Sequence, residues 1–374
     1  ALLDADELAA ATPDYRANLV SSTRRGFDGD GDGKISLNEY LLSMLGNFNY
    51  PWNSLPKDDN NDQRLSFEEF VFFGERSLFQ LQRRYFFHRL DADADQRLSG
   101  EEFEFKLKSV NSLTRFDIDS GETVELFRQR EFPSCGSPSV SADGKWILFD
   151  AASIAGISKT RVMKMTADGK DVQDLCDGLM PSWSPDGTQF ACSRYTGGSG
   201  VWIVGADGVP QKRVSDGWAA QWSPDGKSIA FTRNNSLCVY DVGSEKIRVA
   251  LEKNAHPYQY IFWNMSWSPD SKQMVFKGRL TNKQEIAIVN MTEQPDLKRL
   301  FASDKHLASD LAWSPDGGRI LFSMHSPKAG KNQIYQLATG SGQPELFPGL
   351  GADHSWGSVG FSPDGKWLVL SSTD

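Results

Sequence analysis

The chain has few cysteines, no long apolar run and no surplus of basic residues. Its four cysteines (Cys135, Cys176, Cys192 and Cys238) show neither a CxxC pair nor a Cys/His spacing that would predict a zinc site. No apolar stretch is long enough to predict a membrane span. With 49 acidic and 40 basic residues, the chain is a poor candidate for binding nucleic acid.

These absences leave a globular protein of 374 residues, long enough for two or three domains. We expect its cysteines to be buried thiols. A disulfide between Cys135 and Cys176 is the alternative, and it requires an oxidising compartment.

The negative charge is concentrated in the first third of the chain. Residues 1–112 contain 20 acidic and 13 basic residues, a net of −7, whereas residues 113–374 contain 29 and 27, a net of −2. This difference indicates two regions of different character. It also indicates that the first region needs positive counter-charges.

Three acidic stretches in that region follow one pattern: DGDGDGKISLNE at 28–39, DDNNDQRLSFEE at 58–69 and DADADQRLSGEE at 91–102. Each has Asp or Asn at positions 1, 3 and 5, an apolar residue at 8, serine at 9 and glutamate at 12. Apolar residues recur at helical spacing on either side. Residues 1–112 resemble the EF-hand family, which implies a helical domain with three calcium loops.

Calcium explains the spacing because it is a hard cation that takes six to eight oxygen ligands. Alternate side chains of a tight loop point inward, the backbone carbonyl at position 7 adds another oxygen, and the closing glutamate contributes two. Three bound Ca²⁺ ions would offset the local charge of −7. The expected ligands are Asp28, Asp30, Asp32, Lys34 and Glu39 in the first loop, Asp58, Asn60, Asp62, Arg64 and Glu69 in the second, and Asp91, Asp93, Asp95, Arg97 and Glu102 in the third.

Two features depart from the EF-hand pattern. Position 6 needs a positive φ, yet only the first loop has glycine there (Gly33), and the others have Gln63 and Gln96. We therefore expect these two loops to bind calcium more weakly or to be more rigidly framed, but still to bind it. The motif usually occurs in pairs, and the N-terminal segment DADELAAATPDY supplies no ligand pattern for a fourth loop, so the sequence leaves open which loops pair.

The remaining residues, 113–374, contain a repeat. The stretches SVSADGKWILF, SWSPDGTQFAC, QWSPDGKSIAF, SWSPDSKQMVF, AWSPDGGRILF and GFSPDGKWLVL place aspartates at 143, 186, 225, 270, 316 and 364, at intervals of 39 to 48 residues. Such a period, with short strand-like runs between turns, predicts a six-bladed β-propeller. The WSPDG motif resembles TolB-like, WD-repeat-like propellers. Because the last repeat supplies only two strands, we expect residues 113–127 to complete its blade.

One face of this propeller collects polar side chains that could bind a ligand. In each predicted blade, the loop that leads into the first strand and the loop that follows the second strand lie at the same end of the sheet. The charged and histidine residues that map to these loops are His256, His306, His325, His354, Arg194, Arg233 and Arg279. The aromatic residues Tyr258, Tyr260, Trp263, Trp218 and Trp356 lie in neighbouring loops. Arginines suit carboxylate or sulfate groups, and aromatic faces stack on sugar rings.

We therefore expect a calcium-binding protein in which calcium is mainly structural and the propeller recognises a protein or an acidic glycan. One alternative is a metal-dependent lyase or hydrolase that acts on acidic polysaccharide at the His/Arg face, similar to oligogalacturonate lyases. Another is a calcium sensor that alters propeller binding. The sequence contains no GxSxG motif, so it does not predict a serine peptidase. Weak calcium loops suit a periplasmic or secreted location. The sequence does not determine the oligomeric state.

Overall fold

In a computed structural model of the chain, the described residues are 94–98, 110–129, 132–152, 160–291, 295–304, 307–340 and 342–373, with three isolated two-residue strands nearer the N-terminus. The chain divides into two compact units, Ala1–Phe105 and Lys106–Asp374. The helices expected around the three acidic loops, and most of the loop residues, lie outside the described residues.

Four short strands in the first unit coincide with positions 7 to 9 of the acidic loops or pair with them. They are β1 (Leu2–Leu3), β2 (Ile35–Ser36), β3 (Leu65–Ser66) and β4 (Arg97–Leu98). β3 and β4 are antiparallel, and Leu65 is the partner of Leu98. The second and third loops therefore pair at position 8. In the same antiparallel manner Ile35 of the first loop pairs with Leu3. The first loop thus pairs with the strand Leu2–Leu3, although the N-terminal segment has no calcium-loop pattern.

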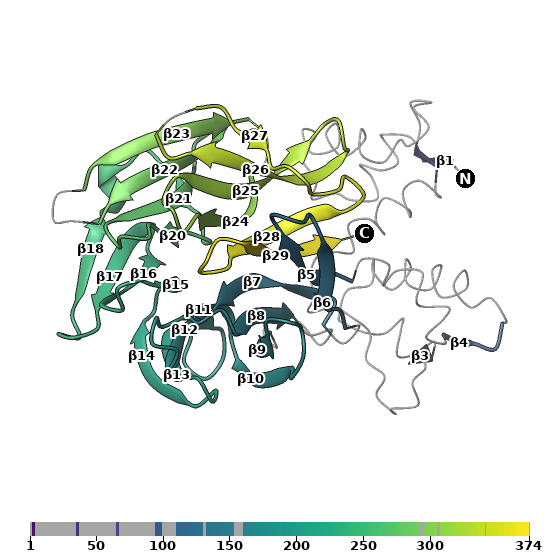
Figure 1. Cartoon of the computed structure of the whole chain (residues 1–374), viewed down its shortest axis with the longest axis horizontal. Helices are drawn as coiled ribbons and strands as arrows, with labels where there is room; N and C mark the ends of the chain where they lie inside the picture. The colour runs from purple at the N-terminus through teal and green to yellow at the C-terminus, as the bar shows by residue number, and fades with distance from the viewer. Residues whose placement is uncertain are drawn as a thin grey trace. The chain divides into compact units, whose positions relative to one another are not determined.

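The second unit is a propeller of six sheets (Figure 1). The first blade contains β7 (Ser134–Val140), β8 (Trp146–Ala152), β9 (Arg161–Thr166) and β10 (Gln173–Asp177). The second contains β11 (Leu179–Trp183), β12 (Gln189–Arg194), β13 (Gly200–Gly205) and β14 (Pro210–Ser215). The third contains β15 (Trp218–Trp222), β16 (Ser228–Arg233), β17 (Ser236–Asp241) and β18 (Ile247–Leu251).

The other three blades follow the same antiparallel order. The fourth contains β19 (Tyr260–Ile261), β20 (Ser266–Trp267), β21 (Gln273–Arg279), β22 (Gln284–Asn290) and β23 (Leu297–Ser303), and a short 3-10 helix, Lys253–Ala255, precedes it. The fifth contains β24 (Leu307–Trp313), β25 (Arg319–Ser326), β26 (Lys331–Ala338) and β27 (Glu345–Leu346). The sixth contains β28 (Ser355–Phe361), β29 (Trp367–Thr373), β5 (Ser112–Asp117) and β6 (Thr123–Phe127).

The sixth blade confirms the predicted closure of the ring. Its two inner strands come from the C-terminal end of the described chain and its two outer strands from residues 112–127, with Leu370 paired to Thr114. In Figure 1 the yellow strands β28 and β29 lie beside the dark blue strands β5 and β6. The sixth sheet therefore has four strands like the other blades, and the β29–β5 pairing joins the two ends of the repeat region.

The repeated motif forms the turn between the first two strands of each blade. Its serine hydroxyl donates to the aspartate two residues later, at 2.5 to 2.7 Å in all six repeats. The residue after the aspartate has a positive φ, which glycine adopts without strain. The fourth repeat has Ser271 at this position, with φ 60°. There the Ser271 hydroxyl accepts a hydrogen bond, at 3.0 Å, from the backbone N–H of Asp225 in the motif turn of the third repeat.

Hydrophobic clusters fill the spaces between neighbouring blades. Phe149, Phe190, Phe231, Phe276 and Phe322 are all fully buried, and they lie on the second strands of the first five blades. Six clusters of this kind each join two adjacent blades, including the pair formed by the sixth and the first. The core is therefore a ring that depends on all six blades.

The cysteines are free and buried, as expected. The alternative disulfide between Cys135 and Cys176 is wrong for this structure. These residues lie on β7 and β10, the two outermost strands of one four-stranded sheet. Three strand spacings of about 4.8 Å separate them, well beyond the reach of a disulfide. Cys176 instead shares a hydrophobic cluster with Cys192.

Candidate functional site

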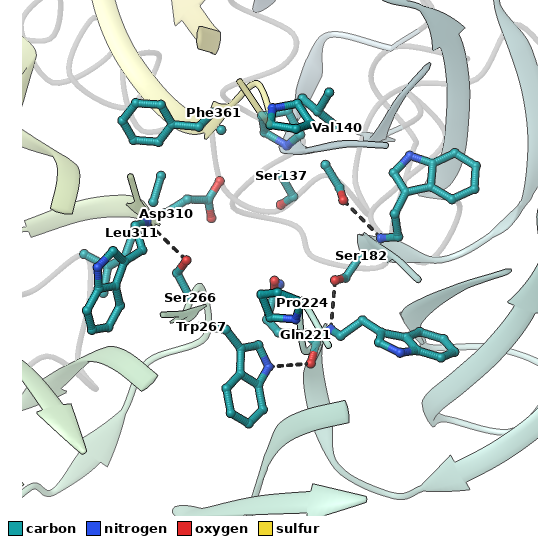
Figure 2. Close-up of a pocket in the computed structure, with 18 of the residues that line it drawn as sticks. Ser137, Val140, Ser182, Gln221, Pro224, Ser266, Trp267, Asp310, Leu311 and Phe361 are labelled. Carbon is teal, nitrogen blue, oxygen red and sulfur yellow. Dashed lines mark hydrogen bonds between the residues drawn. The ribbon is translucent and has the colours of Figure 1, made fainter. Parts of the chain in front are cut away.

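A cavity of about 480 Å³ runs along the propeller axis. The first strands of all six blades line it, from a ring of side chains at its inner end to the prolines of the motif turns at its mouth (Pro185, Pro224, Pro269, Pro315 and Pro363). Figure 2 shows residues from every side of the ring around an open centre.

Two equivalent positions in each blade line or support the inner end. The first, here named the inner ring, lies three residues before the motif tryptophan or the residue that replaces it. Its members are Ser137, Met180, Ala219, Asn264, Asp310 and Ser358. The first four have positive φ values of 48° to 67°. They lie where the first strand is irregular and the register shifts, so the backbone is held in an unusual conformation at this depth.

The second position lies on the second strand, seven residues after the motif aspartate, and is named the staple ring. Its members are Asp150, Ser193, Thr232, Lys277, Ser323 and Ser371. Several join a blade to the next one: the Ser193 hydroxyl accepts from the Ala219 N–H at 2.8 Å, and the Ser323 hydroxyl donates to the Trp356 carbonyl at 2.6 Å. Four of the six staple-ring residues are serine or threonine, so their hydrogen bonds are made by a hydroxyl.

Three ionisable side chains occupy these rings. Asp310 is 8% exposed, and its Oδ1 accepts a hydrogen bond from the Asn264 side-chain amide. Lys277 is 2% exposed and donates to the Leu307 carbonyl at 3.2 Å. Asp150 accepts from the Met180 N–H at 2.8 Å.

Removal from water shifts the pKa of all three groups toward the neutral form. It raises the pKa of Asp150 to about 6, although the Met180 N–H opposes the shift, and the Asp310 charge adds to it. It lowers the pKa of Lys277 to about 8, with Asp310 opposing. It also raises the pKa of Asp310, against hydrogen bonds from Ser358 and Asn264 and the Lys277 charge. Such linked groups beside a cavity are typical of a binding or catalytic centre.

A second feature lies at the end of the strands opposite the motif turns, on the face to which the histidine and arginine loops map. Here the rings of Tyr195, Trp218, Trp263, Tyr260 and Phe262 form a continuous series, named the aromatic patch. Successive centroids are 4.6, 6.3, 6.4 and 5.3 Å apart. Tyr195, Tyr260 and Trp263 are 38 to 40% exposed, and they are the exposed aromatic side chains among the residues that the structure describes.

The three predicted arginines lie around this patch, one at the end of the second strand of blades two, three and four. Arg194 directly precedes Tyr195 and stacks over Trp202 at 5.1 Å. Arg233 is 3.8 Å from the carboxylate of Asp216. Arg279 is exposed and is the cross-strand partner of Tyr260.

The predicted histidines have separate surroundings. His256 uses both ring nitrogens: Nδ1 accepts from the Tyr258 N–H at 3.2 Å, and Nε2 lies 3.0 Å from the Asn235 carbonyl. His354 packs edge-on against Trp356. His325 is exposed on β25, and His306 lies outside the described residues. Tyr258 and Trp356, also predicted for this face, are buried and belong to the core.

Only part of the third acidic loop is described. Gln96, at position 6, has φ 63°, which is the conformation that the calcium-loop pattern requires there. The Arg97 N–H donates to Asp95 Oδ1 at 2.8 Å. The other predicted calcium ligands, including every ligand of the first two loops, lie outside the described residues. Within the part of the chain that is described, no cluster of three or more His, Cys, Asp or Glu side chains is arranged to hold a metal ion.

The repeated motif does not predict the axial centre, because its residues lie in the turns and not at the inner end of the cavity. A signal was nevertheless present. Aligning the repeats three residues before the tryptophan and seven after the aspartate shows Asp310, Asp150 and Lys277 as charged exceptions among small or polar residues. Tyr195 was missed because it follows the strand-ending arginine and carries no motif of its own.

Comparison with known proteins agrees with the propeller. Residues 219–374 match the TolB beta propeller domain family. Putative TolB from Agrobacterium tumefaciens has a TM-score of 0.56 at 17% identity, covering 71% of this chain and 99% of that one. For TolB from Acinetobacter baumannii the TM-score is 0.49 at 14% identity, covering 71% and 63%. No curated protein matches the chain. At these identities the likeness shows the fold alone, a TolB-like six-bladed propeller. Among the described residues, no helix has the length and apolar character needed to cross a membrane.

Proposed function

We propose that this TolB-like propeller is a recognition module that binds an acidic oligosaccharide at the aromatic patch, and that the N-terminal unit binds calcium. The observation that carries the first part is the series of Tyr195, Trp218, Trp263 and Tyr260 across three adjacent blades. Exposed aromatic side chains rarely gather on a surface without a partner.

The patch has the chemistry of a sugar-binding surface. Its rings come from three blades, so they can follow several residues of an extended chain. Aromatic faces stack on the apolar faces of sugar rings, and guanidinium groups form charge-assisted hydrogen bonds with carboxylate or sulfate. Arg279 is exposed beside Tyr260, and Arg194 and Arg233 are partly exposed at the equivalent ends of their strands.

A protein partner is the second candidate, because aromatic residues and arginine are also the residue types enriched where protein interfaces bind most strongly. A protein would cover the patch with a larger buried area than a sugar chain. The two candidates share the same residues and differ in the ligand.

The calcium proposal is supported by the first unit's short strands. Leu65 and Leu98, at position 8 of the second and third loops, are cross-strand partners, which is the arrangement expected of paired calcium loops. The positive φ of Gln96 adds a second, independent feature. We propose that Ca²⁺ stabilises this unit by binding the folded state, at the calcium concentrations of a periplasmic or extracellular space.

Binding of defined oligosaccharides, measured by calorimetry, tests the recognition proposal. The probes are a galacturonate hexamer, a sulfated heparin hexamer and neutral maltohexaose. We expect one of the acidic probes to bind, and Trp263→Ala to weaken it at least tenfold. Leu346→Ala is the matched control, because Leu346 is exposed at 55% on the outer strand of blade five.

Three results would contradict recognition of an acidic glycan. These are equal binding of maltohexaose, an unchanged affinity in Trp263→Ala, and no binding by any probe. In the last case, affinity capture with Trp263→Ala as the negative control tests the protein candidate. Cleavage of the acidic probe during the titration would instead support the lyase alternative.

A further inference from the structure

We infer that the inner end of the axial cavity binds an organic cation with N–H donors, a primary ammonium or guanidinium group on an aliphatic stem, and that Asp310 is its acceptor. This site adjoins the aromatic patch, because the Lys277 ammonium lies 5.6 Å from the centre of the Phe262 ring. It uses Asp310 and not the aromatic faces, and it does not depend on the function proposed for the patch.

The repeat itself shows that these charges are exceptions. At the staple ring, four blades use serine or threonine, and the Ser193 and Ser323 hydroxyls make the blade-to-blade hydrogen bonds. Asp150 and Lys277 make the equivalent bonds to Met180 and Leu307 with charged groups. Burying a charge costs more free energy than burying a hydroxyl, so the fold alone gives no reason for these two residues.

One carboxylate oxygen of Asp310, Oδ2, is buried without a hydrogen-bond partner among the described residues. The other, Oδ1, accepts from the Asn264 amide, and the nearby Ser358 hydroxyl favours the ionised carboxylate. Buried carboxylate oxygens nearly always have a donor. Asp310 lines the cavity and extends toward its centre in Figure 2, so a donor bound in the cavity would lie next to this carboxylate.

The charges favour a single positive group. Asp310 and Asp150 are acidic, and Lys277 is the basic residue that interacts with Asp310. With all three ionised, the centre has a net charge of −1, which one organic cation neutralises. A calcium ion takes six to eight oxygen ligands, usually several of them carboxylates, and no group of three or more His, Cys, Asp or Glu side chains among the described residues is arranged to hold a metal ion.

The walls suit an aliphatic stem. Between the inner ring and the mouth, the cavity is lined by the apolar residues Val359, Leu311 and Met265, interspersed with polar residues such as Ser182, Gln221 and Ser266. A volume of about 480 Å³ lies within the range of small-molecule sites. An alkyl chain could therefore lie along these walls while its charged end reaches Asp310.

Titration calorimetry at pH 7.5 with pentylamine tests the site, using 1-pentanol as the uncharged analogue and CaCl₂ as the metal probe. We expect pentylamine to bind at least tenfold more tightly than pentanol. Asp310→Asn should weaken pentylamine at least tenfold, through loss of a charge-assisted hydrogen bond. Asp119→Asn, an exposed aspartate on the outer turn of blade six, should leave it unchanged.

Asp150→Ser is a second variant, for use if Asp310→Asn does not fold. It introduces the residue type that most other repeats have at this position, so we expect it to fold. It should weaken pentylamine several-fold. A second probe, Nα-acetyl-lysine methylamide, identifies the source: tighter binding than pentylamine indicates a protein side chain, and weaker binding a free amine. The inference is overturned if pentanol binds as well as pentylamine, if CaCl₂ displaces it, or if neither amine binds at 10 mM.

Discussion

The Ser112 hydroxyl lies 2.8 Å from the Ser372 hydroxyl, although 260 positions separate the two residues in the sequence. They are partners at the junction between β5 and β29, where the beginning of the propeller meets its end. This junction closes the ring, so strands from both ends of the repeat region share one blade. Its stability should therefore influence the whole propeller.

Leu113→Ala tests that closure. Leu113 is fully buried on β5 and packs with Phe149 and Val369 in the cluster between the sixth and first blades. We expect the free energy of unfolding to fall by about 2–5 kcal/mol, as for other buried leucines. Val124→Ala, on the exposed edge of the same blade, should change it little. Equal effects in denaturant unfolding would show that residues 112–127 are not part of the propeller core.

Ser271 allows the effect of a positive φ to be measured. Ser271→Gly and Ser271→Ala both remove the hydrogen bond from the Asp225 N–H, but only alanine keeps the strain of a Cβ atom at φ 60°. We expect the glycine variant to be more stable than the alanine variant by about 1 kcal/mol. Thermal unfolding of both variants measures this difference. Identical stabilities would contradict a left-handed conformation at this position.

The motif serine should set the acidity of the motif aspartate. The Ser314 hydroxyl, 2.5 Å from Asp316, lowers the pKa of that carboxyl, and the Gly318 N–H contributes in the same direction. In Ser314→Ala the pKa should rise toward its ordinary value, as measured by carboxyl-carbon NMR. A lowered pKa means that the stabilisation is present above the ordinary aspartate pKa and is lost as the pH falls through the folded-state value. The variant should therefore lose less stability on acidification than the wild type.

Lys277 should make stability rise in alkaline solution. Its pKa falls to about 8 in the folded protein, mainly because the side chain is buried, whereas it is near its ordinary 10.5 when unfolded. Between these values the unfolded chain binds more protons than the folded one, so the free energy of unfolding increases with pH.

Lys277→Met should reduce this alkaline rise in denaturant unfolding at pH 8 to 10. Lys253→Met, at an exposed lysine, is the control. An unchanged slope in Lys277→Met would show that Lys277 is not protected from water. The same variant leaves Asp310 without its cationic neighbour, so it should also tighten pentylamine binding.

Calcium binding can be tested at the closing glutamates. Calorimetry of the calcium-free chain should show three sites, and Glu102→Gln should weaken one of them at least tenfold, because it removes a charged ligand. Glu101→Gln, at the neighbouring position 11, removes the same charge without removing a ligand and should have little effect. No calcium uptake by the folded chain, or equal effects of both variants, would refute the proposal.

Much of the propeller could be predicted because its information is local and repeated. The six SPDG-type turns, the blade number and the shared sixth blade all follow from the spacing of motif residues such as Asp186 and Asp364 and from the missing strands at the C-terminal end. Arg194, Arg233 and Arg279 are the last residues of the second strands of their blades, and strand direction alone determines which end of the sheet that is.

The sequence by itself determined the number of blades and the acidic loops, because each depends on residues close together along the chain. It also determined the closure, because the last repeat lacks the two strands that residues 113–127 supply. Only the tertiary structure decided that Asp150 and Lys277 interact electrostatically with Asp310 beside the axial cavity, and that Tyr195 and Trp218 join Trp263 on one surface. These side chains come from different blades, so the packing angle between sheets decides which of them come together. The tertiary structure also decided that His256 bonds to backbone groups, because the partner of each ring nitrogen depends on which loop packs against it.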